Sequence, residues 1–531
     1  MPATPALAPT PGVSAASRQV RRAAARHARR HARRHAVHAD LPALAAPTPG
    51  ATGPTVPGPL LPPPDQPLYV GLLTWLEPLL AGSGHSRPTQ KRLALLGAGL
   101  LAPAGDQGAH GTPAGVAHTA FGLGIGAATQ EASVARRVVR LLDDPHLDPA
   151  RLLPDLTRAL LLVLLAEVER THAHTIGTTA AHADHARGHH GRWIGVRVII
   201  DETTKEDGTH VLVVGLAYRG IVVPLALRTW PQNVPLPEGV YWNAVGTALW
   251  EVRAALPPVL RAHVLVLADR GYGVPAFLDL LSALGWQWLV RVQGQTRLRF
   301  PDGTERPLHT LVPAPGTAWT GGLVPLGSPA PAGAAGAAGA AGAGAVAAPL
   351  TVFKKAGWRH AQVVALWAVG QEEPWLLVTS LRATATCWRD YAVRWAIERL
   401  FLAWKSHGWD LERGGVTAPA RLARLLVGYC LATWWLLAAA LPGAQTHLAE
   451  LASRATRRTG RPPVGTSQLR LPLFPLARPW IAKTSLLTQG QQVFARTPCR
   501  TATPTLCWRF PDWDAPTWSQ QCLNVYHARA T

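Results

Sequence analysis

Three carboxylates occupy positions in the sequence that suit a catalytic site. Asp201 follows the apolar run Val196–Ile200, and Asp269 follows a second apolar run, His263–Ala268. Short apolar runs predict buried strands, and groups at the carboxyl ends of neighbouring strands lie at the rim of a sheet, where sites tend to form. Glu398 is the third carboxylate and lies in the middle of a predicted helix. Each has a simpler interpretation on its own, as an Asp that begins a turn or a Glu on a solvated helix face.

The helix predicted over 386–406 carries four polar residues on one stripe. They are Tyr391, Arg394, Glu398 and Lys405. Since they are spaced by three, four and seven residues, they fall within about 60° of one another around the helix axis. Bulky apolar residues flank the stripe: Trp395, Phe401 and Leu402. An ion pair between the Arg and the Glu at i,i+4, worth a few tenths of a kcal/mol, would leave the Tyr and the Lys unexplained.

The same four positions resemble Y-x2-R-x3-E-x6-K, the signature of the insertion-sequence-four family of DDE transposases. The residues around the first two carboxylates, and two short segments near them, are also similar to motifs of that family. These segments are Ile200–Thr204, Ala268–Tyr272, Tyr218–Gly220 and Pro224–Leu225. The resemblance covers roughly residues 191–440, and this ordered set of motifs is more specific than any single one.

The resemblance implies an α/β protein with a ribonuclease-H-like mixed-sheet catalytic core, a mostly β insertion and an N-terminal helical domain. Asp201, Asp269 and Glu398 would be its catalytic carboxylates and would bind two Mg²⁺ or Mn²⁺ ions, which prefer oxygen ligands. Two such ions about 4 Å apart activate a water or a 3′-hydroxyl and stabilise the leaving oxygen. The site would cut DNA at the ends of an insertion element and join the freed 3′-hydroxyl to target DNA. Members of the family pass through a hairpin intermediate.

The resemblance also implies residues that bind DNA. Three residues of the helical stripe would bind phosphates beside the scissile bond: Tyr391, Arg394 and Lys405. Arg can clamp a phosphate through two hydrogen bonds, whereas Lys supplies a point charge. Arg270, next to Asp269, is a further candidate. In relatives a Trp of the insertion stacks on a flipped base; Trp319 and Trp358 are the candidates here, although core packing is the simpler interpretation of each.

The order of predicted elements divides the chain into six regions. Three strands and a helix are followed by strand, helix and strand, a pattern typical of a mixed α/β sheet. The regions are a basic, Pro- and Ala-rich disordered arm (1–66), a helical domain with a His-rich connector (67–190), the first part of the core (191–300), a β insertion with an Ala/Gly-rich linker (301–375), the second part of the core with the Glu helix (376–445), and a basic C-terminal region (446–531). The helical domain would bind the ends of the element.

The predicted elements are short and mostly apolar. Strands are expected at 196–200, 211–218, 221–227, 263–268, 286–292, 361–369 and 375–380, and helices at 244–255, 275–284 and 386–406. The pair Arg219–Gly220 predicts a hairpin turn. The uncharged run Leu425–Leu441 is at the short edge of what spans a membrane. A buried helix in a large core explains this run equally well, and we expect no membrane insertion.

Composition narrows the class of protein. The 531 residues include 52 Lys and Arg against 31 Asp and Glu, a formal charge of +21, which attracts polyanions such as nucleic acid. A hydrophobic share of 48% excludes a wholly disordered chain and a small disulfide-stapled scaffold. The 5 Cys are scattered without Cys-x-x-Cys spacing, which argues against a thiolate zinc site and favours a reducing compartment.

The favoured function is therefore metal-dependent cut-and-paste transposition by a bacterial DDE transposase. Its partners would be terminal inverted repeats and target DNA, with a dimer in the synaptic complex and a cytoplasmic, nucleoid-associated location. Two alternatives stay open: a decayed or domesticated copy that binds DNA without catalysis, and a ribonuclease-H-like nuclease without strand transfer. The three intact carboxylates argue against the first alternative, and the complete helical stripe favours transposition over the second.

Overall fold

The computed structural model describes most of the chain between residues 66 and 506. The described residues are 66–80, 84–102, 111–125, 130–161, 196–206, 208–218, 220–232, 234, 236–256, 258–261, 264–321, 350–381, 383, 387–407, 409–459, 485–504 and 506. Three predicted segments lie outside them: the arm as far as residue 65, the His-rich connector and the Ala/Gly-rich linker.

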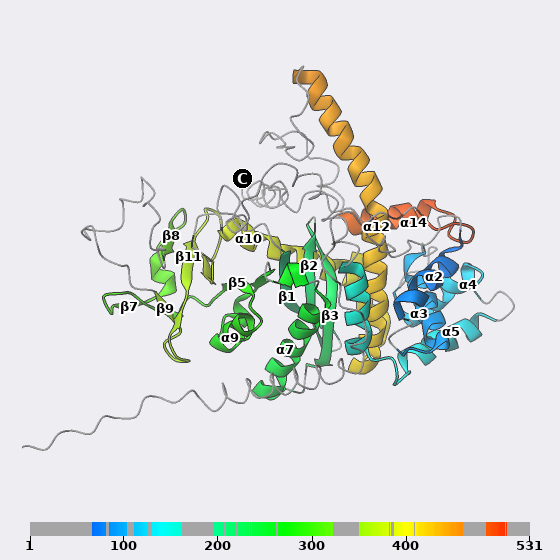
Figure 1. The fold of residues 1–531 in the computed structure, drawn as a ribbon, viewed down its shortest axis with the longest axis horizontal. Helices are drawn as coiled ribbons and strands as arrows, with labels where there is room; N and C mark the ends of the chain where they lie inside the picture. The colour runs from blue at the N-terminus through cyan, green and yellow to red at the C-terminus, as the bar shows by residue number, and fades with distance from the viewer. Residues whose placement is uncertain are drawn as a thin grey trace, which may run out of the picture.

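The N-terminal part of the described chain is helical (Figure 1). Its helices are α2 (Leu68–Leu80), α3 (Arg87–Leu101), α4 (Pro113–Gly122), α5 (Glu131–Leu142) and a further helix at 149–161. Ser86 and Thr112 cap α3 and α4, because each hydroxyl accepts a hydrogen bond from the backbone N–H three residues later. A Pro in the first turn of each helix needs no hydrogen-bond partner there.

A long helix, α12 (Pro419–Thr459), runs beside the N-terminal helices (Figure 1). Its stretch Pro419–Leu441 is long and apolar enough to cross a membrane by length and composition alone. That stretch is mostly buried inside the fold, against α3 and the strand β3 (Ile221–Pro231). This burial favours the interpretation of the run as a core helix. A second C-terminal helix, α14 (Leu486–Arg496), packs along α12.

An eight-stranded mixed sheet forms the centre of the molecule, in the order β3-β2-β1-β4-β5-β12-β11-β8. Besides β3, its first five strands are β1 (Val196–Lys205), β2 (Thr209–Tyr218), β4 (Val264–Ala268) and β5 (Gln287–Arg291). β1, β4 and β5 are mutually parallel, and β2 and β3 are antiparallel to their neighbours. The parallel strands read as continuous apolar runs because both faces of the sheet are covered. This arrangement is consistent with the expected ribonuclease-H-like core.

Strands from later in the chain extend this sheet and build a second one. β12 (Trp375–Thr379), β11 (Gln362–Leu366) and β8 (Ala318–Gly321) continue the main sheet, each antiparallel to its neighbour. The second sheet has the order β10-β9-β6-β7 and consists of β6 (Arg297–Arg299), β7 (Glu305–Pro307), β9 (Thr351–Val352) and β10 (Arg359–His360). These strands lie together at the left of Figure 1, away from the helical end.

Helices cover both faces of the main sheet. α7 (Glu238–Ala255) and α9 (Pro275–Ala283) lie on one face, and a helical path over residues 387–407 lies with α12 on the other. The path consists of α10 (Cys387–Ala392), the 3₁₀-helix η3 (Val393–Trp395), α11 (Ala396–Leu402) and the π-helix η4 (Ala403–His407). A short helix, α8 (Pro258–Arg261), connects α7 to β4.

Two predictions about local structure are wrong. The strand expected to end at Ile200 continues as β1 to Lys205, because the chain beyond Ile200 pairs with β2 in a hairpin after its pairing with β4 has ended. The regular helix expected over 386–406 is interrupted by η3 and η4, where hydrogen bonding changes from the α pattern. Irregular turns of this kind occur often at functional sites.

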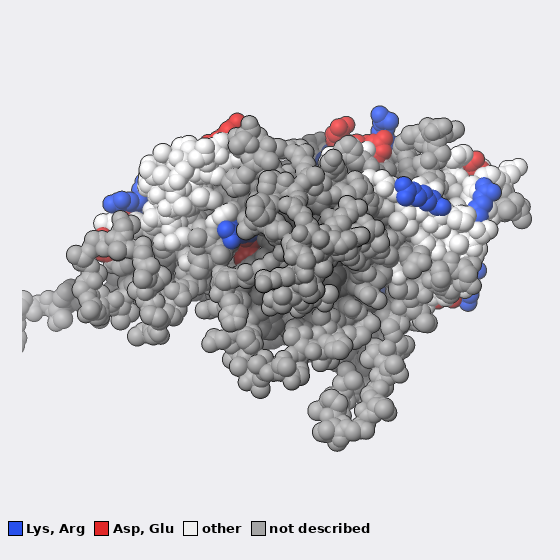
Figure 2. All heavy atoms as spheres, turned by 90° about the horizontal axis from the view of Figure 1, so that it is seen from above, with Lys and Arg blue, Asp and Glu red and all other residues white. Residues whose placement is uncertain are grey.

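Charge on the described surface is mixed. Figure 2 shows Lys and Arg side chains over both the helical end and the β-rich end, interspersed with Asp and Glu. The formal charge of +21 belongs to the whole chain, and the Arg-rich arm lies outside the described residues. Attraction of the described part to a polyanion therefore depends on particular basic residues and on their partners.

Candidate active site

Parallel pairing of β1 and β4 brings two of the predicted carboxylates level with each other. Ile200 pairs with Ala268 at the last step of that ladder, and Asp201 and Asp269 are the next residues. Beyond this point β1 continues beside β2, while the chain after β4 turns into the 3₁₀-helix η1 (Arg270–Tyr272). Both carboxylates thus lie at the rim of the parallel strands, where the sequence led us to expect a site.

Arg394 connects the third carboxylate to the first. Its Nη1 atom donates to Asp201 Oδ2 at 2.6 Å and to Glu398 Oε1 at 3.4 Å. The Arg394 side chain is only 6% exposed, whereas that of Glu398 is 47% exposed. The i,i+4 ion pair considered from the sequence is therefore present as one arm of a contact that joins β1 to the helical path.

The pKa of Asp201 reflects its burial and the charges around it. Burial is the largest influence and raises the pKa of Asp201 to about 6. The Arg394 guanidinium and a hydrogen bond from the Glu202 backbone N–H oppose that rise. The charges of Glu398 and Asp269 add to the rise. Burial also disfavours the charged form of Arg394, but the surrounding acidic groups outweigh it and raise the pKa of Arg394.

Three polar atoms of this cluster are buried without a hydrogen-bond partner among the described residues. They are Oδ1 of Asp269, the hydroxyl of Tyr391 and Nε of Arg394. Such an atom costs roughly 1–3 kcal/mol if it stays unpaired, so its presence in a native site calls for a ligand or water. An unpaired carboxylate oxygen near two more carboxylates suits a hard divalent cation, which takes oxygen ligands.

The side chains do not form a complete metal site as they stand. Within the described ranges, no three His, Cys, Asp or Glu side chains lie close enough together to hold one ion. Arg394 instead occupies the space between Asp201 and Glu398. The donor chemistry therefore fits a divalent cation, but these carboxylates would have to exchange their present partner for it.

Polar contacts also tie the helical path to both ends of β1. Near the start of the strand, Arg197 donates from Nε and Nη2 to Asp390 Oδ1, at 3.2 and 2.6 Å. Near its end, Lys405 Nζ donates to the Thr204 carbonyl oxygen and lies 3.1 Å from Glu412 Oε1. Sequence reasoning missed the Arg197–Asp390 pair. Its one signal was an Arg inside an apolar strand, which is seldom buried unless it is paired.

The predicted DNA-binding residues differ in their access to solvent. Tyr391 is only 2% exposed, and its ring lies edge-on to that of Trp375 at 5.4 Å between centroids. Arg270 is half exposed and pairs with Glu373 at 3.1 Å. Lys405 is 26% exposed. Of the four candidates, Arg270 is therefore the most accessible, and Tyr391 and Arg394 lie inside the fold.

Glu202, which the sequence did not single out, forms a polar cluster on the opposite face of β1. Its Oε1 atom accepts hydrogen bonds from the hydroxyls of Tyr241, at 2.5 Å, and Tyr272, at 2.8 Å. The available signals were weak: Glu202 directly follows Asp201, and Tyr272 ends the Asp-Arg-Gly-Tyr segment.

The two Trp candidates for base stacking lie in the β-rich end. Trp319 on β8 packs edge-on to Phe300, with 6.3 Å between ring centroids. Trp358 lies beside β10, and the Cζ atom of Arg299 is 4.4 Å from its ring centroid. Both side chains are partly exposed, and neither contact favours one of them as the residue that stacks on a base.

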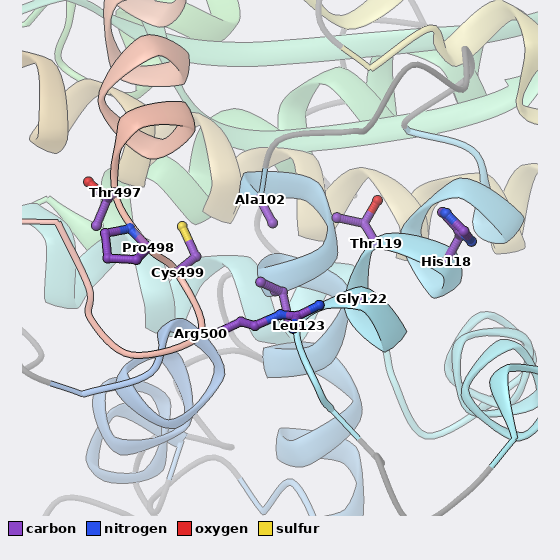
Figure 3. Close-up of a pocket in the computed structure, with 9 residues that line it drawn as sticks. All are labelled: Ala102, His118, Thr119, Gly122, Leu123, Thr497, Pro498, Cys499 and Arg500. Atoms are coloured by element: carbon purple, nitrogen blue, oxygen red, sulfur yellow. The ribbon is translucent and has the colours of Figure 1, made fainter.

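A pocket of ≈ 310 Å³ lies apart from the acidic cluster, between the end of α4 and the turn that follows α14 (Figure 3). Its walls are mostly apolar and include His118, Cys499 and Arg500. His118 pairs with Glu131 at 2.8 Å. Since none of the predicted site residues lines this pocket, it is separate from the candidate active site.

One comparison with known proteins bears on this site. Residues 246–435 match the family model described as the transposase DDE domain. The match includes Asp269, Glu398 and the other residues of the helical stripe. Asp201 precedes it and is brought beside Asp269 by the β1–β4 pairing. No curated protein matches the chain significantly. The matched region supports a DDE transposase family and, with it, transposase function in general.

Proposed function

We propose that this protein is a cut-and-paste DNA transposase of the insertion-sequence-four family, with Asp201, Asp269 and Glu398 as its catalytic carboxylates. The observation that supports the proposal is the contact of the buried Arg394 side chain with both Asp201 and Glu398, beside the end of β4, which pairs with β1. The match to the transposase DDE domain supports the class of reaction. The Tyr391–Lys405 stripe favours the particular family.

The three carboxylates would together bind two Mg²⁺ or Mn²⁺ ions, since oxygen donors suit both. When bound, the ions would activate the attacking water or 3′-hydroxyl and stabilise the leaving oxygen. The three carboxylates come from β1, from the residue after β4 and from α11. Arg394 now covers Asp201 Oδ2 and Glu398 Oε1. Binding of the ions therefore requires it to release at least one of these oxygens.

Arg394, Lys405 and Arg270 would bind the phosphates next to the scissile bond. Each already has an acidic or carbonyl partner, so DNA would bind by exchange of partners. An Arg that leaves a carboxylate for a phosphate keeps a charge-assisted hydrogen bond. The buried Tyr391 hydroxyl lies in the same cluster without a hydrogen-bond partner in the described ranges and would donate to a phosphate oxygen.

The wider proposal follows the same family. The reaction would pass through a hairpin intermediate and end with strand transfer to target DNA. The N-terminal helices would bind the terminal inverted repeats, and two copies would form the synaptic complex. The protein would act in the bacterial cytoplasm, at the nucleoid. The net charge of +21 supports a polyanionic partner.

A cleavage assay tests this function. The full-length protein would be incubated with Mg²⁺ or Mn²⁺ and a labelled duplex that carries the element's own end. We expect a specific nick followed by a hairpin. Asp201→Ala and Glu398→Gln should lower the cleavage rate by about three orders of magnitude, because bound metal ions stabilise the transition state by several kcal/mol. Glu305→Gln, which removes an acidic side chain on β7, is the matched control.

The outcomes separate the alternatives. Normal cleavage by Asp201→Ala or Glu398→Gln would disprove the site. Binding of the end without a nick in either metal would identify a decayed copy that only occupies DNA. A nick that is followed by neither a hairpin nor strand transfer would identify a nuclease of the same fold.

A further inference from the structure

Glu202 follows Asp201 directly in β1 but lies on the other face of the sheet, because successive side chains of a strand alternate between its faces. Its Oε1 atom accepts hydrogen bonds from two tyrosine hydroxyls, Tyr241 on α7 and Tyr272 at the end of η1. We call these three residues the Glu202 latch. It joins three elements that come from separate parts of the chain.

Both tyrosines of the latch remain hydrogen-bond donors over the whole physiological pH range. Burial raises the pKa of Tyr241 and of Tyr272, and the carboxylate of Glu202 raises both further. Tyr272 is 4% exposed, and its ring packs against Phe277 with 5.1 Å between centroids. The latch is therefore a partly buried contact, with Tyr272 as its buried end.

The latch lies where the backbone stops holding the two candidate metal ligands together. The β1–β4 ladder ends at Ala268, and Asp269 Oδ1 has no hydrogen bond to any residue that the structure describes. The position of Asp269 thus depends on the turn that follows it. Tyr272 N–H donates to the Asp269 carbonyl oxygen at 3.0 Å and closes that turn, while the Tyr272 hydroxyl binds the neighbouring strand through Glu202.

The same turn is also confined from the side of β5. A Cβ atom added at Gly273 would lie 2.6 Å from the Arg291 carbonyl oxygen, so this position leaves no room for a side chain. With β5 on one side and Glu202 on β1 on the other, the turn has contacts to both strands that flank β4. Of these contacts, the bond to Glu202 is the one that leads back to the strand with Asp201.

We propose that Glu202 is a positioning residue: through Tyr272 it holds the turn after Asp269 against the strand that carries Asp201, and so fixes the separation of the two carboxylates. The part of this inference that concerns a shared divalent cation rests on the proposed function. The contact itself does not.

The surroundings of Glu202 are unsuited to a direct catalytic or metal-binding role. Its Oε1 atom already has two donors, and its Oε2 atom lies 3.9 Å from His210 Nδ1. The His210 ring stacks on that of Trp230, with 5.7 Å between centroids. These neighbours lie beside Glu202, which is 23% exposed, on the face opposite to Arg394. Its route to the site is the Tyr272 hydroxyl and the turn that ends there.

Two measurements on the full-length protein test the latch. Hydrogen–deuterium exchange of residues 269–273, without metal, reports the turn, and calorimetric titration with Mn²⁺ alone reports the carboxylates. The variants are Glu202→Ala and Tyr272→Phe, which remove the bond, and Glu202→Gln, which keeps an acceptor oxygen. Tyr429→Phe is the matched control. It removes a buried hydroxyl of α12, which donates at 3.0 Å to the Gly111 carbonyl oxygen, outside the latch.

We expect Glu202→Ala and Tyr272→Phe to exchange faster at 269–273 and to bind Mn²⁺ at least about tenfold more weakly, as when an outer partner of a metal ligand is lost. Glu202→Gln and Tyr429→Phe should keep both properties. Unchanged exchange or unchanged Mn²⁺ affinity in the first two variants would overturn the proposal, as would a Gln variant as impaired as the Ala variant. If the parental protein and Asp201→Ala take up Mn²⁺ equally, the proposed metal site fails, and exchange alone then decides whether the latch holds the turn.

Discussion

Two neighbouring carboxylates on opposite faces of β1 have opposite environments. On one face, Asp201 is mostly buried and its pKa is raised to about 6, and nearby polar atoms of Asp269 and Tyr391 have no hydrogen bond within the part of the chain that the structure describes. On the other face, Glu202 has a hydrogen bond from each of two tyrosines. Two adjacent residues of β1 thus belong to an electrostatically unfavourable cluster and to a hydrogen-bonded one.

This difference in hydrogen bonding indicates which face of β1 is suited to bind a ligand. A fully hydrogen-bonded network rigidifies its surroundings, while a partly satisfied one is unfavourable until something completes it. The face with Asp201 is therefore the one where a cation or a phosphate would be stabilised. The face with Glu202 supplies the rigidity that such a site needs, since catalytic groups must be held in place by their supporting residues.

The largest effect on stability is expected where the helical path over 387–407 is attached to β1. Arg197 and Asp390 form a buried ion pair, with side chains 10% and 3% exposed. Asp390→Ala leaves the Arg197 charge without this partner, and breaking a buried pair in this way destabilises a protein by about 3–5 kcal/mol. Urea unfolding at pH 7.5 measures the loss.

The double variant Arg197→Met/Asp390→Leu is the control for this prediction. Because it removes both charges and refills the space, it should recover most of the lost stability. A double variant as unstable as Asp390→Ala would show that contacts other than the ion pair attach the helical path to β1.

The next effect is a gain in stability from removing the unfavourable charge. The pKa of Asp201 is raised in the fold from 3.8 to about 6, first by burial, so the fold favours the neutral form. The stability that this group contributes is fully present below pH 3.8 and is lost as the pH rises through 6. Asp201→Asn, which is neutral at every pH, should therefore be more stable than the parental protein at pH 7.5, by at most about 3 kcal/mol.

Thermal unfolding from pH 3.5 to 8 in the presence of EDTA measures this difference. The two proteins should be equally stable at the acid end and diverge as the pH rises through 6. A variant that is less stable than the parental protein at pH 7.5 would mean that the ion pair with Arg394 outweighs the burial of the carboxylate.

The placement of the candidate site residues on the Asp201 face of β1 was largely predictable from the sequence, because they lie in local patterns. Apolar runs predicted β1 and β4, and the spacing of Arg394 and Glu398 predicted a shared helix face. Pairing of parallel strands then brings Asp201 and Asp269 together. The end of β1 was misplaced because the residues after Ile200 are polar, and their strand character comes from pairing with β2 rather than from apolar periodicity.

The contacts that support the site, on either face of β1, could not be predicted in the same way. Tyr272 lies 70 residues from Glu202, and Asp390 lies 193 residues from Arg197. Neither pair has a spacing that a single sequence reveals, because each contact depends on how separate elements pack. The irregular turns η3 and η4 were missed for the same reason, since the apolar pattern of the helix continues through them.

The smallest effect on stability is expected at the exposed pair next to Asp269. Arg270 and Glu373 form a half-exposed pair, 51% and 57% exposed, and Glu373 also accepts from Arg291. Surface pairs contribute about 0–1 kcal/mol, so Glu373→Ala should unfold within that range of the parental protein. Its effect on DNA should be clearer, because it frees the Arg270 guanidinium for a phosphate. The slope of log affinity for a non-specific duplex against log salt concentration should become steeper by about 0.9. Glu305→Ala, which removes the same charge from a pair with Lys354, is the control, and equal slopes for the two variants would remove Arg270 from the DNA interface.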